Sequence, residues 1–443
     1  MRADVSLGCA ADRSRILTED SLRSLWIVCA LVLAHGATAA PAAPAASLAR
    51  AARSILGAGQ GAYVEAADGT VLLQQAAGHP VHPASVSKIA TTLALLREFG
   101  PEHCFRTVFA SEGVIRDGTL QGDLWVQGEN DPALVDEDAL LIAARLNALG
   151  IRRVAGALRV HGALTFNWQS DPQAARLARA LTGGASEAAW TSVRALAPAG
   201  ATDASPPAIE LAGAAVLPAR AALDERATPA LDGHADAAAA VPARTLIVHC
   251  SQPLLPLLKS LNDYSNNIFK PFADAAGGAQ AVQNLARSLV PAGMSAEIVL
   301  GDGAGTDPRN RLSPRAAVKL LRALELVLAA SGHTLADVLP VAGVDQGTLH
   351  ERLDGAQERG RVVGKTGTFG DYGASALVGA IRTRARGTVY FAILDHGIPV
   401  REARHRQDRA VRLLLAALPG PLWPYTRDVR PAAARAQLSS GGL

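Results

Sequence analysis

Apolar residues recur after Pro83 in a pattern that predicts a helix. Ile89, Leu93, Leu95 and Leu96 supply the apolar positions, and Pro83 stands where the first turn of a helix tolerates proline. The polar residues that lie between Pro83 and Ile89 are therefore expected at the start of a buried helix.

Strand-like runs lie on both sides of this helix. An Asp-Gly turn at 68–69 joins two of them into a hairpin, and a second such turn at 117–118 lies between the next two. We expect strands at 62–66, 71–74, 105–109, 120–126, 154–160, 245–249, 375–381 and 388–394, and further helices at 136–149, 254–261, 279–289, 314–328 and 401–418.

The order of these elements predicts an α+β fold, in which helices flank an antiparallel sheet and an accessory region is inserted. From about 171 to 243 the chain is rich in Ala, Pro and Gly, and its periodicity is poor. We expect a signal peptide at 1–39, the first part of the main domain at 40–104, the inserted accessory region at 105–243, and the second part of the main domain at 244–443.

The first 40 residues have the features of an export signal. Arg13, Arg15 and Arg23 precede an apolar run at 25–34, and the small residues at 37–39 suit cleavage by signal peptidase. The run is too short for a comfortable membrane span. We therefore expect a periplasmic protein that keeps no stable membrane span after cleavage.

Composition narrows the classes of partner. Hydrophobic residues make up 49% of the chain, enough for a large core, and the net charge of +3 is small for 443 residues. Nothing here favours nucleic-acid binding. No cluster of His, Cys and acidic residues has the spacing of a metal site, and no cofactor is expected. Cys104 and Cys250 remain in the mature chain; they could pair in an oxidising compartment, although two lone buried thiols are the default expectation.

Ser85 and Lys88 are spaced to bring a hydroxyl and an amine together. Three positions apart on a helix, they lie on one face, close to the positive end of the helix dipole. The chain has 43 Lys and Arg residues but only five lysines, which suggests that a lysine is kept where a proton must be lost. Alone, however, Ser-x-x-Lys is a weak signal.

Two further motifs follow in the chain, Ser265-Asn266-Asn267 and Lys365-Thr366-Gly367. Alone, the second could cap a helix and the third could form a turn. With Ser85 and Lys88, and in this order, they resemble the active-site signature of the penicillin-recognising serine acyl-transferases, which include penicillin-binding proteins and serine β-lactamases.

The long interval between the first and second motifs selects a branch of that superfamily. It resembles the D-alanyl-D-alanine carboxypeptidase/endopeptidase family, the low-molecular-mass class C penicillin-binding proteins. Glu129-Asn130, Ala304 and Lys270-Pro271 depart from the pattern of that family. The further matches are Asp131-Pro132, Asp302-Gly303-Ala304-Gly305, Asn310-Arg311-Leu312-Ser313-Pro314, Val341-Ala342-Gly343-Val344-Asp345, Gly347-Thr348-Leu349 and Ser375-Ala376-Leu377.

The resemblance implies a catalytic role for four residues. Ser85 is the expected nucleophile toward the carbonyl between two D-alanines, and Lys88 the base, kept neutral by burial and by the nearby charge of Lys365. Ser265 is the expected proton relay to the leaving amine. Asn267 is expected to hydrogen-bond the substrate backbone and Lys88.

The third motif implies the substrate-binding strand. Lys365 and Thr366 are expected to hold the terminal carboxylate of a peptidoglycan stem peptide, and Gly367 to permit its close approach. Backbone amides of Ser85 and Thr368 are expected to bind the oxyanion. β-Lactam antibiotics are the expected inhibitors.

Two other functions remain open at this point. A serine β-lactamase uses the same acyl-serine but releases it quickly, although a compact β-lactamase lacks the inserted region. A non-catalytic peptidoglycan-binding homologue would keep the fold but would not catalyse release of D-alanine at a useful rate.

Overall fold

The structure is a computed structural model of the 443-residue chain. The chain divides into two compact units, Met1–Ala46 and Ser47–Leu443, and the second holds nearly all the elements below. The predicted signal peptide lies outside the described residues. Within the described part of the chain, no helix is long and apolar enough to cross a bilayer. The described residues are 43–129, 131–196, 205–213, 244–264, 268–370, 373–428 and 436–440.

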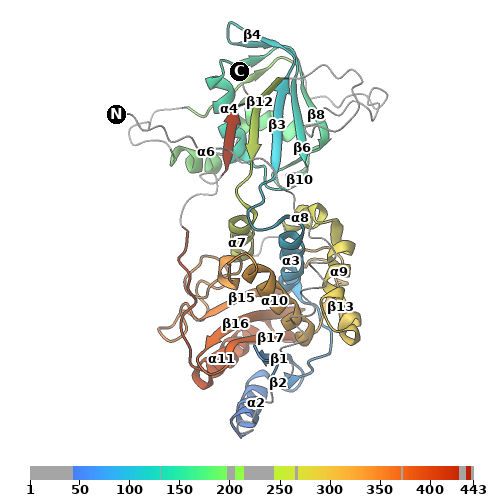
Figure 1. Ribbon diagram of the computed structural model, residues 1–443, viewed down its shortest axis with the longest axis vertical. Helices are drawn as coiled ribbons and strands as arrows, with labels where there is room; N and C mark the ends of the chain where they lie inside the picture. Colours follow the sequence, from blue (N-terminus) through green and yellow to red (C-terminus); the bar gives the residue numbers. More distant parts are fainter. Residues whose placement is uncertain are drawn as a thin grey trace. The chain divides into compact units, whose positions relative to one another are not determined.

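The main sheet has five antiparallel strands in the order β15-β16-β17-β1-β2 (Figure 1). It joins distant parts of the chain, because β1 pairs with β17 along its whole length. β16 and β17 are buried at nearly every position. The strands are β1 (Gly61–Ala66), β2 (Val71–Gln75), β15 (Val362–Phe369), β16 (Ala374–Thr383) and β17 (Gly387–His396).

Helices cover both faces of the main sheet. Alternate side chains of a strand point to opposite faces, so Val378 packs with α3 and α10, whereas Leu377 packs with α2 and α11. Two separate apolar cores therefore form, one on each face. The helices are α2 (Ala43–Leu56), α3 (Lys88–Phe99), α10 (Pro314–Ala329) and α11 (Val400–Ala417).

Helix α3 is the most enclosed of these helices. Its residues from Lys88 to Leu96 are all buried, and it packs against α10 and against three shorter helices. The expected helix is correct, but its first turn differs: Ser85 lies in a 3-10 turn, η2 (Ala84–Ser87), and the α-helix begins at Lys88. The shorter helices are α7 (Leu254–Tyr264), α8 (Phe269–Ala275) and α9 (Gly278–Ser288).

The middle of the chain builds two further sheets, ordered β18-β12-β3-β6-β8 and β11-β7-β5-β4. Two expected strands are each divided between these sheets: the run at 120–126 becomes β5 and β6, and the run at 154–160 becomes β7 and β8. The elements are β3 (Arg106–Ser111), β4 (Val114–Arg116), β5 (Thr119–Gln121), β6 (Leu124–Glu129), β7 (Arg153–Val154), β8 (Leu158–Ala163), β11 (Glu210–Leu211), β12 (Arg244–Cys250) and β18 (Gln437–Ser440).

A salt bridge explains the division at 120–126. The chain turns at Gly122, and the Asp123 side chain accepts a hydrogen bond from the backbone N of Ala157 at 2.7 Å and pairs with Arg159. These contacts fix the second half of the run beside β8, which it pairs with in parallel. The hydrophobic pattern alone does not predict this turn, because the turn depends on contacts with residues more than 30 positions away.

Short helices and hairpins complete the fold. The region from 171 holds two helices and a π-turn where the sequence gave no clear periodicity. The predicted α+β class and the expected helices at 136–149, 254–261, 279–289, 314–328 and 401–418 are confirmed. The remaining elements are α4 (Asp136–Ala148), α5 (Ala175–Arg179), η3 (Ala180–Gly184), α6 (Glu187–Arg194), β9 (Thr165–Phe166), β10 (Gln169–Ser170), η4 (Ala292–Glu297), β13 (Ile298–Val299), β14 (Arg311–Leu312) and η5 (Leu335–Asp337).

Strand β12 is where the chain leaves the sheet β18-β12-β3-β6-β8, called here the accessory sheet, for the helices around the main sheet. It pairs with β3 and with β18, and the chain then enters α7 directly. Cys104 and Cys250 lie close to this crossing and are not joined by a disulfide. Both thiols are half-buried, whereas we expected them to be fully buried. Each cysteine lies near the end of a strand, where part of the side chain stays accessible.

Candidate active site

Ser85 and Lys88 are in hydrogen-bond contact. Ser85 lies in the 3-10 turn and Lys88 begins α3, so the three-residue spacing places Lys88 Nζ 2.8 Å from Ser85 Oγ. Lys88 is completely buried, whereas Ser85 keeps 9% of its surface exposed. The pair therefore combines a hydroxyl at the edge of solvent with an amine that is shielded from it.

The surroundings of Lys88 favour its neutral form. Burial lowers the pKa of Lys88 to about 8, although the Asp302 carboxylate opposes the shift. Nζ also donates to the backbone O of Ala304 and lies 5.5 Å from the centre of the Phe269 ring. A neutral amine at this position can accept the proton of the Ser85 hydroxyl.

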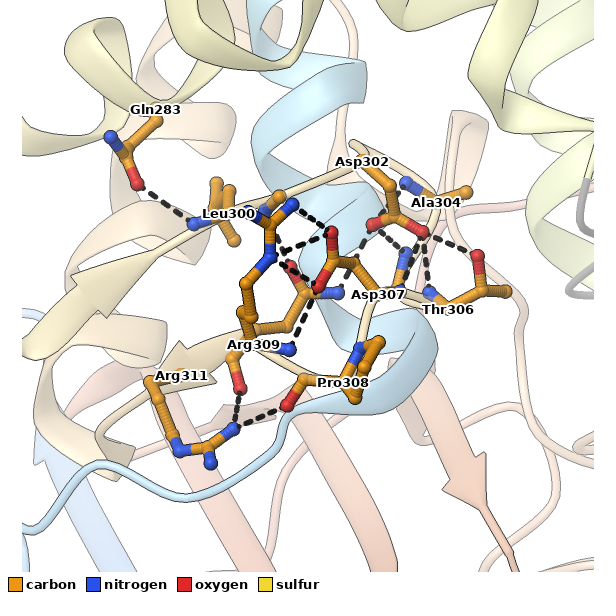
Figure 2. A network of polar contacts seen from close by, with 12 residues as sticks. Gln283, Leu300, Asp302, Ala304, Thr306, Asp307, Pro308, Arg309 and Arg311 are labelled. Atoms are coloured by element: carbon orange, nitrogen blue, oxygen red, sulfur yellow. Dashed lines mark hydrogen bonds and ion pairs between the residues drawn. The ribbon is translucent and has the colours of Figure 1, made fainter.

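The loop that supplies the Ala304 carbonyl is held by one carboxylate (Figure 2). Asp302 accepts hydrogen bonds from the backbone N of Gly305 at 2.9 Å and of Thr306 at 2.6 Å, and from the Asn310 amide at 3.0 Å. Burial works against the charge of Asp302, but these hydrogen bonds outweigh it, and its pKa is lowered. Position 304 thus contacts Lys88 through its backbone.

The third motif lies inside β15. Lys365 is completely buried and donates to the backbone O of Thr366 at 3.0 Å. Burial and then the charge of Lys88 lower the pKa of Lys365 well below its usual value. Asp263 partly opposes this shift. The charge of Lys88 thus acts on Lys365, whereas burial alone lowers the pKa of Lys88, so the expected contribution of Lys365 to a neutral Lys88 is not found.

Gly367 allows β15 to lie against η2, the turn that holds Ser85. A Cβ atom at this position would meet the backbone O of Pro83 at 2.5 Å and the backbone N of Ser85 at 3.1 Å. Any side chain would therefore push β15 away from Ser85. Thr368 follows on the same strand, so the two amides expected to bind an oxyanion belong to neighbouring segments.

The second motif lies outside the described residues, but its flanks are tied to the site. Helix α7 ends at Tyr264, directly before Ser265 and Asn267. The backbone O of Asp263 accepts from the backbone N of Thr348 at 3.0 Å, and Thr366 Oγ1 donates to Thr348 Oγ1 at 2.8 Å. A chain of contacts thus joins the end of α7 to the third motif.

Sequence reasoning assigned no role to three residues of the site. Thr348 stood in a recognised motif but carried no role, and Phe269 gave no signal because apolar residues are common in helices. His82 precedes the first motif and contacts two other segments through its ring nitrogens. Within the described ranges, no group of three His, Cys, Asp or Glu side chains could hold a metal ion.

The site places a serine hydroxyl next to a buried lysine amine in an α+β fold, which is the arrangement expected of a lysine-assisted serine acyl-transferase. A model of the D-Ala-D-Ala carboxypeptidase 3 (S13) family matches residues 45–173 and 233–417. The match covers most of the chain, and the chain belongs to this family. The protein is therefore a serine-type D-Ala-D-Ala carboxypeptidase, a hydrolase, which confirms the function predicted from the three motifs.

One curated relative and two solved structures illustrate the similarity, the structures at the level of the fold. The D-alanyl-D-alanine carboxypeptidase of Actinomadura sp. (strain R39) is 28% identical over 420 residues, covering 75% of this chain and 77% of its own. The penicillin G-acylated Bd3459 predatory endopeptidase of Bdellovibrio bacteriovorus has a similar fold, with a TM-score of 0.70 at 21% identity, over 86% of this chain and 99% of its own. Penicillin-binding protein 4 of Haemophilus influenzae also has a similar fold, with a TM-score of 0.57 at 17% identity, over 83% of this chain and 99% of its own.

Proposed function

We propose that Ser85 is the nucleophile of a D-alanyl-D-alanine carboxypeptidase/endopeptidase reaction on peptidoglycan stem peptides. The observation that carries this proposal is the 2.8 Å contact between Ser85 Oγ and the buried Lys88 amine. Lys88 takes the hydroxyl proton as Oγ attacks the carbonyl between two D-alanines. The C–N bond then breaks, D-alanine leaves with a proton, and water hydrolyses the acyl-serine.

The substrate lies along β15 in this proposal. Lys365 and Thr366 hold the terminal carboxylate of the peptide, and Thr368 donates its backbone N, with that of Ser85, to the oxyanion. The close contact between β15 and the nucleophile turn supports this arrangement. Ser265 relays the proton to the leaving amine, and Asn267 binds the substrate backbone; these two roles rest on the motif.

The setting of the enzyme follows from its substrate. We propose that residues 1–39 direct export and are removed, that the mature enzyme works in the periplasm, and that residues 105–243 form an inserted accessory region. The charge pattern of the first 40 residues and a family that acts on D-Ala-D-Ala support this. β-Lactams acylate Ser85 in this proposal, and the similar Bd3459 endopeptidase has been described in a penicillin G-acylated form.

Labelling with a β-lactam tests the proposal. Mature protein incubated with a fluorescent penicillin should gain one adduct, which mass spectrometry should locate on Ser85, and the Ser85→Ala variant should gain none. Ser288→Ala, which removes an exposed serine of α9, serves as the control and should label like wild type. Labelling of another residue would refute the proposal.

A second assay separates the alternative functions. Wild type should release D-alanine from a stem pentapeptide and should hold the penicillin adduct much longer than the time needed to form it. Rapid release of hydrolysed penicillin would instead indicate a β-lactamase, and absence of D-alanine release would indicate a non-catalytic homologue.

A further inference from the structure

His82 contacts three segments of the site and has no role in the reaction described above. Its Nδ1 atom lies 3.1 Å from the backbone N of Ala84, and its Nε2 atom lies 3.0 Å from the backbone O of Asp307. Its ring stacks on the ring of Phe369, with the centroids 3.9 Å apart. The side chain therefore links the nucleophile turn, the loop that follows Asp302, and the end of β15.

The two backbone partners fix the protonation of the ring. The N–H of Ala84 can only donate, so Nδ1 must accept, and the carbonyl of Asp307 can only accept, so Nε2 must carry the proton. The neutral Nε2–H tautomer satisfies both contacts. A doubly protonated ring would set an N–H at Nδ1 against the N–H of Ala84, and that contact would be repulsive.

The charged surroundings of His82 act in both directions. Burial, the largest effect, lowers the pKa of His82, and the positive charge of Arg311 lowers it further. The hydrogen bond to the Asp307 carbonyl and the carboxylates of Asp302 and Asp307 act against this, and the pKa remains lowered from its usual value. The ring is therefore neutral at the pH at which Lys88 can act as a base.

The residue that His82 holds has an unusual backbone. Ala84 has a φ of 49°, in the left-handed region that residues with a Cβ rarely adopt, and it directly precedes Ser85. Its backbone O also lies so close to Gly305 that a Cβ there would be 2.1 Å away. Such a conformation persists only where the surrounding structure fixes it, and the His82 acceptor is one of the contacts that do so.

We propose that neutral His82 is a positioning residue for acyl transfer, which holds the Ala84 amide so that the Ser85 hydroxyl and backbone N face the substrate. This inference rests on the proposed role of Ser85. His82 itself touches no reacting atom, and it acts through the turn that carries the nucleophile.

The proposal predicts how the acylation rate depends on pH. Because Lys88 must be neutral, the logarithm of the rate should fall with a slope of one as the pH decreases below about 8. Protonation of His82 removes the acceptor for Ala84. The slope should therefore exceed one over the interval in which His82 gains its proton, below its ordinary pKa, and return toward one at lower pH.

Two variants separate the contacts of the ring. His82→Phe keeps the aromatic stack but loses both hydrogen bonds, whereas His82→Asn places a side-chain oxygen where it can accept from the backbone N two residues later. The second-order rate of acylation by a fluorescent penicillin is measured from pH 5 to 8, with the folded fraction followed by circular dichroism. At pH 7.5, His82→Phe should be slower by about tenfold, the equivalent of one lost hydrogen bond.

The His82→Asn variant supplies the decisive comparison. It should recover most of the rate that His82→Phe loses at pH 7.5. A wild-type rate in His82→Phe, a His82→Asn variant as slow as His82→Phe, or a loss of rate that only follows loss of folded protein would each overturn the inference. Absence of any Ser85 adduct in wild type would instead refute the proposed function.

Discussion

Lys88 shows how burial gives a single residue its chemistry. Its amine has hydrogen bonds to Ser85 and to one carbonyl, with an aromatic ring nearby, and no carboxylate within ion-pair distance among the described residues. Lys259 is also buried, but it donates to two carbonyls and to the carboxylate of Asp345. The two buried lysines therefore differ in their partners: Lys259 is paired with a carboxylate, whereas Lys88 contacts a hydroxyl.

Replacement of Lys88 by arginine tests whether proton acceptance is required. Arginine keeps the positive charge but cannot lose its proton under these conditions, so the rate of acylation by penicillin should fall by about 10²–10⁴-fold. Lys270→Arg is a matched control, because Lys270 lies exposed on α8. A Lys88→Arg variant that acylates within a few-fold of wild type would show that another group takes the proton.

The pKa of Lys88 sets the pH dependence of the same step. Since the neutral amine is the active form and its pKa is lowered to about 8, acylation should be fast above pH 8 and fall about tenfold for each unit below it. Stopped-flow measurement of the acylation rate against pH gives the midpoint. A midpoint near 10, the value of an ordinary lysine, would contradict the described burial.

At the scale of elements, the site is formed by backbones that approach each other closely. β15 lies against η2 at Gly367, and the loop after Asp302 lies against η2 at Gly305. Both contacts use a glycine where any Cβ would overlap a backbone atom. The position of Ser85 therefore depends on two segments that are each more than 200 residues further along the chain.

Gly305→Ala should test this close approach. A Cβ at Gly305 would lie 2.1 Å from the backbone O of Ala84, so we expect the free energy of unfolding to fall by about 2–4 kcal/mol. Gly332→Ala is the matched control, since Gly332 has a similar φ of 80° and nothing within 4 Å of its Cβ position.

Urea denaturation of both variants measures the difference. The control carries the cost of the left-handed backbone alone, about 1 kcal/mol. Equal losses in the two variants would mean that the contact with the nucleophile turn contributes nothing.

At the scale of the whole molecule, a buried charged cluster fastens β12 to the accessory region. His249 Nε2 lies 3.0 Å from Asp138 of α4, and Nδ1 lies 3.7 Å from Asp131 in the loop after β6. Burial disfavours the charge of His249, but the two carboxylates outweigh burial and its pKa is raised. β12 leads directly into α7, so this cluster lies on the strand that connects accessory and main regions.

The raised pKa of His249 makes stability depend on pH. A folded-state pKa above the unfolded value means that the contribution is complete below about pH 6.5 and is lost as the pH rises through the folded pKa. Relative to a His249→Gln variant, the unfolding free energy of wild type should decrease with rising pH, by at most about 1.4 kcal/mol per pH unit.

Chemical denaturation of both proteins from pH 6 to 9 measures this difference. Other titrating groups affect both proteins alike, so they cancel. A constant difference across that range would show that folding does not raise the pKa of His249.

The sequence contained the site in outline. The Ser85–Lys88 spacing dictates contact because a helical turn brings side chains three apart to one face, and the 3-10 turn preserves that effect. The rarity of lysine was a partial guide, since Lys88 and Lys365 lie at the site but Lys259 is held by carbonyls and Asp345. Single-residue signals did not reveal Thr348 or His82, whose importance depends on distant neighbours.

Local information therefore determined helix α3, which begins directly after the turn that holds Ser85, most strands, the α+β class and the three motifs, because periodicity and short-range spacing act within a few residues of the chain. Tertiary structure decided the rest: how far Lys88 is removed from water, which carbonyl it meets, and that β12 and β18 complete the accessory sheet. Those properties depend on burial and on contacts between segments hundreds of residues apart, and desolvation has no counterpart in a linear sequence.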